Sequence, residues 1–226
     1  RETEWRCPQA QEIIERIDGI LRQLPKAEKQ AHERIIGGRQ VTSTEKILSL
    51  YEPDVQVVVR GKLGSEVEFG NPILLGEQAD GLIVHHHLYK KVVSDAKILI
   101  EGVENIEERL DIELRGVCAD RGFGSKENTK ALGKARDYIC PRQIEALREK
   151  MENGEFAKRQ RRRSQTEGRI SIFVHRILGD LLRMKGYANR EMAVSWGALG
   201  HNVWKLAEMR KNQAEKQERE ARKKAA

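Results

Sequence analysis

Hydrophobic positions in the first part of the chain change from a helical to a strand period. Up to about residue 36 they recur every three or four residues, with Pro25 interrupting the run and Gly37-Gly38 ending it. From Lys46 the runs become short and β-type, and they predict strands at 47–51, 55–59, 67–75 and 82–89. Turn residues separate the last three, which favours an antiparallel meander.

The remainder of the chain alternates helix and strand. A helix capped by Ser94 is predicted to reach about Arg109, and a buried strand at 114–119 leads directly into Asp120. The following elements are a helix at about 125–135, a strand at 137–140, a helical region from Pro141 to about 183 and a last helix at about 189–209. This order predicts an α/β fold, a mixed sheet flanked by helices.

Three segments follow from these patterns. Residues 1–43 form a helical segment, residues 44–209 form the main domain, and residues 210–226 form a charged tail that is either a solvated helix or disordered. Trp196 and Trp204 both belong to the last predicted helix, and core packing is the expected reason for them.

Charge and cysteine content exclude several classes of protein. Lys and Arg number 42 against 35 Asp and Glu, a net charge of +7 that is compatible with a polyanionic partner but modest. The three cysteines lie far apart, so neither a disulfide framework nor a zinc site is indicated. No apolar run approaches membrane length and no secretory start is visible, so we expect a cytoplasmic protein without a membrane partner.

The first candidate for chemistry is Asp120, at the carboxyl end of a predicted buried strand. Gly122 and Gly124 permit a tight turn after it, and Ser125 can cap the next helix. Sites in open α/β sheets are built at such strand ends. An aspartate there also commonly does no more than cap or turn the chain, and that structural interpretation stays open.

The second candidate is Glu167, which follows a basic run at 159–163. Arg163 lies four residues before it, so an ordinary helical ion pair is an equally good interpretation of this segment alone. Together, an acid at a strand end and an acid on a basic helix suit phosphodiester chemistry. Mg²⁺ or Mn²⁺ would be held by carboxylates, two ions being typical of such sites, and the cations would hold phosphates.

Four ordered blocks resemble DDE-type insertion-sequence transposases, which have an RNase H-like catalytic domain. These blocks are KILSLYEPDVQVVVRGKLGSEVEFGN, ADRGFGSKEN, RRRSQTEGRISIFVHR and WGALGHNVWKLA, and the resemblance covers about Thr44 to Met209. It implies that Asp120 is the second and Glu167 the third metal-binding acid of the family's triad, and that Arg163 matches the family's arginine four residues before the glutamate.

The resemblance also implies an activity and partners. The parent protein would cleave DNA strands at element ends and transfer them to a target, as a homo-oligomer, in the nucleoid of a prokaryotic cytoplasm. The expected DNA-binding residues are Arg60, Lys62, Arg121, Arg162, Arg163, Arg169, His175 and Arg176. The alternative is an inactive truncated transposase that binds DNA weakly and without sequence preference.

The sequence departs from the family pattern at three points. Gln160 replaces a tyrosine and Val174 replaces a lysine. The family's first aspartate has no clear counterpart, and we expect it upstream of Arg1, with residues 1–43 as the end of an insertion. Within the chain the possible substitutes are Asp54, ranked first, and Asp80 and Asp95, and all three also suit ordinary turn or helix-start roles.

Overall fold

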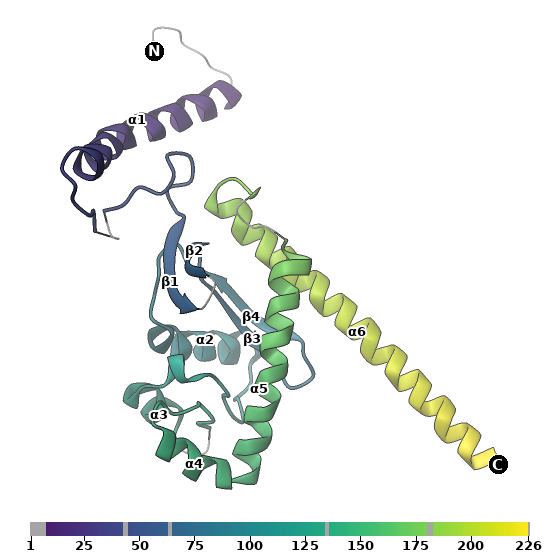
Figure 1. Ribbon diagram of the computed structural model, residues 1–226. Helices are drawn as coiled ribbons and strands as arrows, with labels where there is room; N and C mark the ends of the chain where they lie inside the picture. Colours follow the sequence, from purple (N-terminus) through teal and green to yellow (C-terminus); the bar gives the residue numbers. More distant parts are fainter. Residues whose placement is uncertain (1–7, 43–44, 63–64, 134–135, 180–182, 226) are drawn as a thin grey trace. The chain divides into compact units, whose positions relative to one another are not determined.

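The computed structural model describes residues 8–42, 45–62, 65–133, 136–179 and 183–225. The chain divides between Asn71 and Pro72 into two compact units, and Figure 1 shows the elements of each. Helices and strands are both present, so the predicted mixture of the two is confirmed. The sequence pattern had placed its first boundary between residues 43 and 44.

The first unit contains helix α1 (Pro8–Ile35) and a hairpin of β1 (Gln56–Lys62) and β2 (Ser65–Gly70). Helix α1 continues through Pro25, so the predicted interruption is wrong. It ends close to the predicted stop, where Gly38 adopts a φ of 62° that glycine accepts without strain. None of the residues of α1 is buried.

Residues 47–51 do not form the strand that their apolar pattern predicted. The hydroxyl of Ser49 accepts hydrogen bonds from the backbone N–H groups of Tyr51 and Glu52, at 3.2 and 3.1 Å. A serine that bonds its own neighbours offers the backbone an alternative to a strand ladder. The chain therefore bends here.

The second unit begins with an antiparallel hairpin of β3 (Ile73–Glu77) and β4 (Ile83–Leu88). The predicted meander is wrong: among the described strands, β2 pairs with β1 and β3 with β4, in two separate sheets. The apolar run that predicted one strand at 67–75 is divided at Asn71-Pro72, because proline has no N–H to contribute to a ladder.

Helix α2 (Asp95–Leu110) covers one face of the β3–β4 hairpin. Leu74 and His85 point toward this helix, and Gly102 permits the close approach, because a Cβ there would lie 3.0 Å from the side chain of Leu74. The helix begins after Ser94, as the sequence predicted, but the Ser94 side chain makes no capping hydrogen bond to the described residues.

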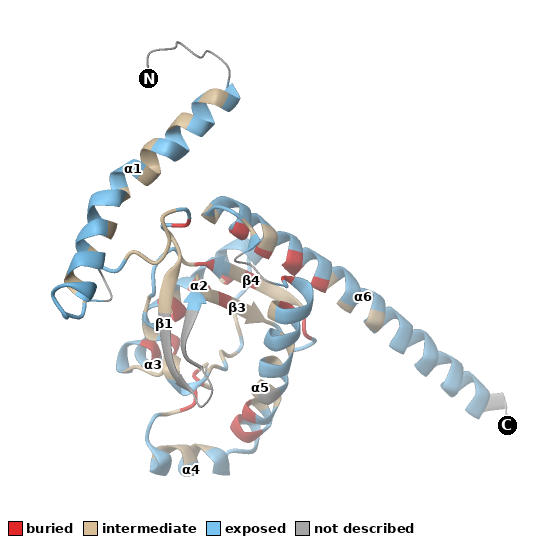
Figure 2. Ribbon diagram, turned by 45° about the horizontal axis from the view of Figure 1, so that its top comes forward, coloured by how far each residue is buried: buried red, intermediate tan, exposed pale blue. Residues whose placement is uncertain are grey.

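The other face of the hairpin packs against η2 (Phe173–Ile177), a π-helical turn, and against the first half of α6 (Tyr187–Ala225). Figure 2 shows the buried residues of α6 where this helix passes β4. The core between these elements consists of Leu88, Phe173, Leu178, Val194 and Ala198. Gly197 allows the contact, since a Cβ there would lie only 2.6 Å from the side chain of Leu178.

The predicted strands at 114–119 and 137–140 are present only as short extended segments, paired parallel through the bridge Val117–Asp137. Backbone hydrogen bonds of 2.8, 3.0 and 2.9 Å join them. Each segment has the other as its single partner among the described residues, and a two-stranded pairing of this kind is marginal. That explains why neither extends into a regular strand.

Helix α2 also covers this extended pair, so one helical layer serves both pieces of sheet. Leu99 and Val103 of α2 form a core with Leu132 and Ile139. Leu132 ends helix α3 (Lys126–Leu132), which is shorter than the predicted helix. The predicted cap is confirmed, because the Ser125 hydroxyl accepts the backbone N–H of Asn128 at 3.1 Å.

The long helical region after Pro141 is divided into α4 (Ile144–Glu152) and α5 (Gly154–Ile172). The carboxamide oxygen of Asn153 accepts the backbone N–H groups of Glu155 and Phe156, at 3.0 and 3.1 Å. Asparagine in this position starts a new helix instead of continuing the old one.

The last helix is longer than predicted and differs in what it buries. It includes the charged tail, whose residues are exposed where described. Trp196 and Trp204 are 66% and 56% exposed, so core packing does not explain them. None of the helices in the described ranges combines the length and apolar content that crossing a lipid bilayer requires.

Two histidines of β4 should make stability depend on pH. Desolvation and the nearby Arg109 lower the pKa values of His85 and His86 below their ordinary value of 6.5. The two imidazoles therefore bind a proton more tightly in the unfolded chain than in the folded one. Their contribution to folding stability is present above about pH 6.5 and is lost as the pH falls below that value. Urea unfolding at about pH 5.5 and about pH 7.5 should show this loss. If the double variant His85→Gln/His86→Gln lost as much stability as the wild type on acidification, the assignment would be wrong.

Candidate functional site

Asp120 lies directly after the extended segment 117–119 and begins the short helical turn η1 (Arg121–Phe123). Its Oδ1 accepts the backbone N–H of Gly122 at 2.7 Å. The capping role that the sequence left open is therefore present. The side chain is exposed, and its other oxygen accepts no hydrogen bond within the described part of the chain.

The carboxylate of Asp95, in the first turn of α2, lies beside that of Asp120. A Cβ built on Gly122 would lie 2.8 Å from Asp95 Oδ2 and 2.9 Å from Asp120 Oδ1. Because residue 122 is a glycine, the carboxylates of Asp95 and Asp120 can both approach its Cα. Of the possible substitutes for the first acid within the second unit, Asp80 serves its own turn, whereas Asp95 lies beside Asp120. Asp54 belongs to the first unit.

Glu167 lies on α5, with a side chain that is 62% exposed. Its Oε1 accepts Arg163 Nη1 at 2.5 Å, the ion pair expected between residues four apart on a helix. Arg163 also donates through Nε to Gln160, at 3.2 Å. Gln160 replaces the family tyrosine, and its amide donates to the carbonyl of Tyr138 at 2.7 Å. This row of contacts fixes the middle of α5 to the extended segment at 137–140.

The segment that leads to Asp120 also packs on α5. The Cys118 thiol donates to the carbonyl of Arg159 at 3.6 Å. Desolvation raises the pKa of this thiol, and the nearby Arg163 and Arg159 partly oppose that effect. Cys118 is therefore no activated nucleophile. These contacts mean that the strand end bearing Asp120 and the helix bearing Glu167 belong to one packed structure.

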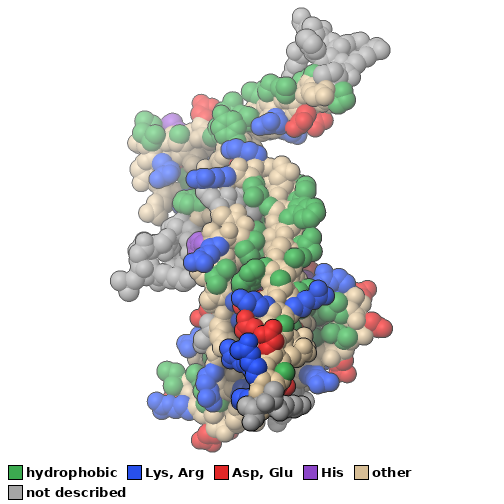
Figure 3. Space-filling view, turned by 90° about the vertical axis from the view of Figure 1, so that its right-hand side faces the viewer, with side chains coloured by type: hydrophobic (Ala, Val, Ile, Leu, Met, Phe, Trp, Pro, Cys, Tyr) green, Lys and Arg blue, Asp and Glu red, His purple; other side chains and the backbone are tan. Residues whose placement is uncertain are grey.

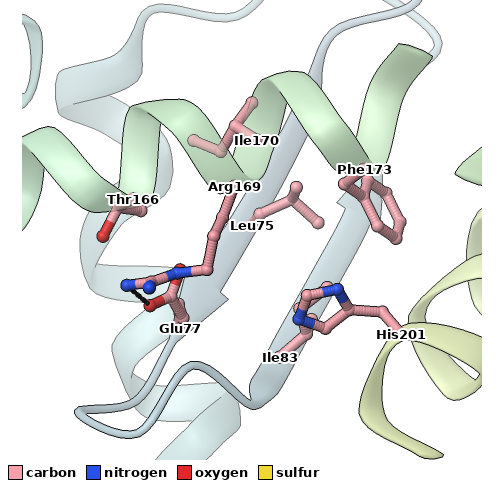
Figure 4. Close-up of a pocket in the computed structure, with 8 residues that line it drawn as sticks. All are labelled: Leu75, Glu77, Ile83, Thr166, Arg169, Ile170, Phe173 and His201. Atoms are coloured by element: carbon pink, nitrogen blue, oxygen red, sulfur yellow. Dashed lines mark hydrogen bonds and ion pairs between the residues drawn. The ribbon is translucent and has the colours of Figure 1, made fainter. Parts of the chain in front are cut away.

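Two of the predicted phosphate-binding arginines are engaged with Glu77, whose side chain is 9% exposed. Arg169 holds Glu77 with two contacts, Nη2–Oε1 at 2.5 Å and Nε–Oε2 at 2.9 Å, and Figure 4 shows the pair. Arg162 lies 3.8 Å from the same carboxylate and donates to the carbonyl of Gln78. The cavity beside them, which His201 also lines, is about 10 Å³, enough for one water molecule and too small for a ligand.

The remaining predicted DNA-binding residues are distributed over other elements. Arg121 of η1 and both His175 and Arg176 of η2 are exposed. The side chains of Arg60 and Lys62 lie outside the described part of the structure. The described members of the predicted set are therefore divided among η1, α5 and η2.

A basic hollow along α5 includes one cation, Lys158, that the sequence prediction of the site left out. It measures about 490 Å³ and is lined by Gly154, Lys158, Arg161, Arg162 and Gln165. Lys158 and Arg161 lie three residues apart on one helix face, and this spacing was the available signal. Glu77 had no comparable signal, because an acid before a turn usually faces solvent and its partner Arg169 is 92 residues away.

Within the described ranges, no three His, Cys, Asp or Glu side chains converge into a metal site. Comparisons of the chain with protein-family models, with curated proteins and with solved structures found no match.

Proposed function

We propose that the chain is a catalytic part of a DDE-type insertion-sequence transposase with an RNase H-like fold. Asp120 and Glu167 are its ligands for Mg²⁺ or Mn²⁺. The observation that supports this most is the packing of the strand end before Asp120 onto the basic helix that carries Glu167. The shared cover of α2 over both pieces of sheet supports the fold.

The two acids fit part of such a metal site. Each is exposed and has committed one carboxylate oxygen, to the N–H of Gly122 and to Arg163 respectively. Hard divalent ions accept a few carboxylate oxygens and keep several waters, so the remaining oxygens suit them. Asp95 is a third acid at the same end of the extended segment. When bound, the ions would activate the attacking oxygen and stabilise the leaving one.

The protein's own residues would position the nucleic acid. Arg163 orients the Glu167 carboxylate through their ion pair, and Gln160 holds Arg163 in turn. Lys158 and Arg161 line the basic hollow on the same helix, where a phosphate backbone would find cations without any base being read.

The second candidate is an inactive truncated transposase that only binds DNA weakly, and one observation favours it. Asp120 and Glu167 already have structural partners, as an N-cap and as a helical ion pair. A protein that only needs these contacts has no use for the free carboxylate oxygens. Metal binding separates the two candidates.

The test is a calorimetric titration of the chain with Mn²⁺. Asp120→Asn and Glu167→Gln should each weaken binding by about tenfold or more, since loss of a ligand should cost at least as much as loss of a group that orients one. The matched control is Glu145→Gln, an exposed acid on α4 that should leave binding unchanged. Equal Mn²⁺ binding by all four proteins would refute the metal site.

DNA binding should be salt-sensitive and independent of sequence. Replacing Lys158 and Arg161 with alanine removes two cations from the basic hollow. The slope of log affinity against log salt concentration should then decrease by about 2, one for each cation that no longer neutralises a phosphate. Labelled duplexes titrated at several salt concentrations give this slope. Lys26→Ala/Lys29→Ala on α1, with the same loss of charge, is the control, and an equal decrease there would remove the basic hollow from the proposal.

A further inference from the structure

Helix α6 carries an apolar stripe on the face that it turns away from its own core. The stripe consists of Met192, Trp196, Leu199, Val203 and Leu206, which are 53%, 66%, 52%, 59% and 47% exposed. The opposite face of the same turns, at Val194, Ala198 and His201, is buried. In Figure 3 hydrophobic side chains lie along the first half of α6, and charged ones surround its C-terminal part.

The stripe is too large to be an ordinary surface feature. It contains one tryptophan, one methionine and three aliphatic side chains, and the 56% exposed Trp204 lies on a flank of the same helix. Monomers rarely expose contiguous apolar patches beyond a few hundred Å², and larger ones mark interaction sites. The exposed area is on the order of the 800 Å² per partner that a standard interface buries.

We propose that this stripe binds the same stripe of a second copy of the chain, with the two α6 helices antiparallel. Its residues are spaced by four, three, four and three positions, the pattern that pairs helices side by side. A twofold axis would place Leu199 against Val203 of the partner subunit, and Trp196 against Leu206 of the partner subunit. The interface is thus complementary to itself, as twofold dimers require.

Small residues flank the stripe on one side and would let the two helices come close. They are Ala193, Gly200 and Ala207. A Cβ at Gly200 would meet nothing within 4 Å, so this flank is open in the monomer. In the antiparallel arrangement Gly200 would face its own counterpart, and Ala193 would face Ala207 of the partner subunit.

The apolar contact would be confined to the first half of α6. The stripe stops before Arg210, and beyond it α6 carries charges of both signs in pairs such as Lys211–Glu215 and Lys216–Glu220. The contact adds an interaction surface that the proposed metal site neither requires nor explains.

Sedimentation equilibrium of the wild-type chain should show a monomer–dimer equilibrium. Leu199→Glu should raise the dimer dissociation constant by at least about tenfold, because it buries a charge in the contact. Asn212→Glu introduces the same side chain on α6 outside the stripe and should leave the constant unchanged. Leu199 is half exposed in the monomer, so circular dichroism should show both variants folded. A wild-type chain that stays monomeric at about 100 µM, or equal constants for the two variants, would overturn the proposal.

A mixing experiment tests the direction of the helices. Leu199→Lys and Val203→Glu should each weaken the dimer when alone. Mixed, they should associate at least about tenfold more tightly than either alone, because the lysine would face the glutamate of the other chain. A parallel pair would place each residue against its own counterpart, so mixing would bring no lysine opposite a glutamate. Absence of rescue would therefore refute the antiparallel arrangement.

Discussion

Replacing Glu77 with alanine should lower the free energy of unfolding by about 3 kcal/mol, because it leaves the two arginines around it without their shared acid. The Glu77 side chain is 9% exposed, and that of Arg169, which binds it with two contacts, is 23% exposed. A cation this deep cannot recover its full hydration when its partner is removed. Urea unfolding monitored by circular dichroism gives the change.

Glu167→Ala is the matched control, because it removes another acid paired with an arginine. Its side chain is 62% exposed, and exposed pairs four residues apart on a helix contribute about 0–1 kcal/mol. The double substitution Glu77→Leu/Arg169→Leu should recover part of the stability, since apolar residues can replace a buried ion pair at little cost. Equal losses for Glu77→Ala and Glu167→Ala would show that the environment of Glu77 does not matter.

Features encoded by neighbouring residues could be predicted from the sequence. The start of α2 after Ser94, the cap of α3 at Ser125 and the glycine stop after α1 each depend on a few adjacent positions. The location of Asp120 after an extended segment follows in the same way from a short apolar run before a turn. Its capping of Gly122 was the open structural alternative, and the structure contains it.

Features decided by distant partners could not be predicted. The apolar run from 67 to 75 has a strand's composition, yet its two halves pair with different strands. The tryptophans of α6 suggested a core because large aromatics are usually buried, whereas the buried face of the helix consists of smaller residues such as Val194 and Ala198. Glu77 and its arginines meet only because β3 lies against α5.

The same limit applies to the candidate site. A single sequence can suggest that Asp120 and Glu167 cooperate, because two acids and a basic helix suit metal-dependent phosphodiester chemistry. The structure adds Asp95 beside Asp120 and a contact between the Asp120 segment and α5. The shared metal ion itself stays a prediction, for which activity is the strictest readout.

Asp120→Asn and Glu167→Gln should each reduce DNA strand cleavage by a factor of about 10³ or more, because both acids would hold ions that act in the transition state. The assay uses the protein expressed from its complete reading frame, with Mn²⁺ and duplexes that carry the element's ends. Each substitution keeps the size of the side chain, and Glu167 is exposed. The free energy of unfolding should therefore change by less than about 1 kcal/mol in each variant. The two acid variants would thus lose cleavage and keep their stability. Glu77→Ala should do the reverse, because it lowers the free energy of unfolding while the protein that stays folded still cleaves DNA. Cleavage that persists in both acid variants, at wild-type rate and with the same dependence on Mn²⁺, would remove Asp120 and Glu167 from the metal site and leave them as a cap and an ion pair.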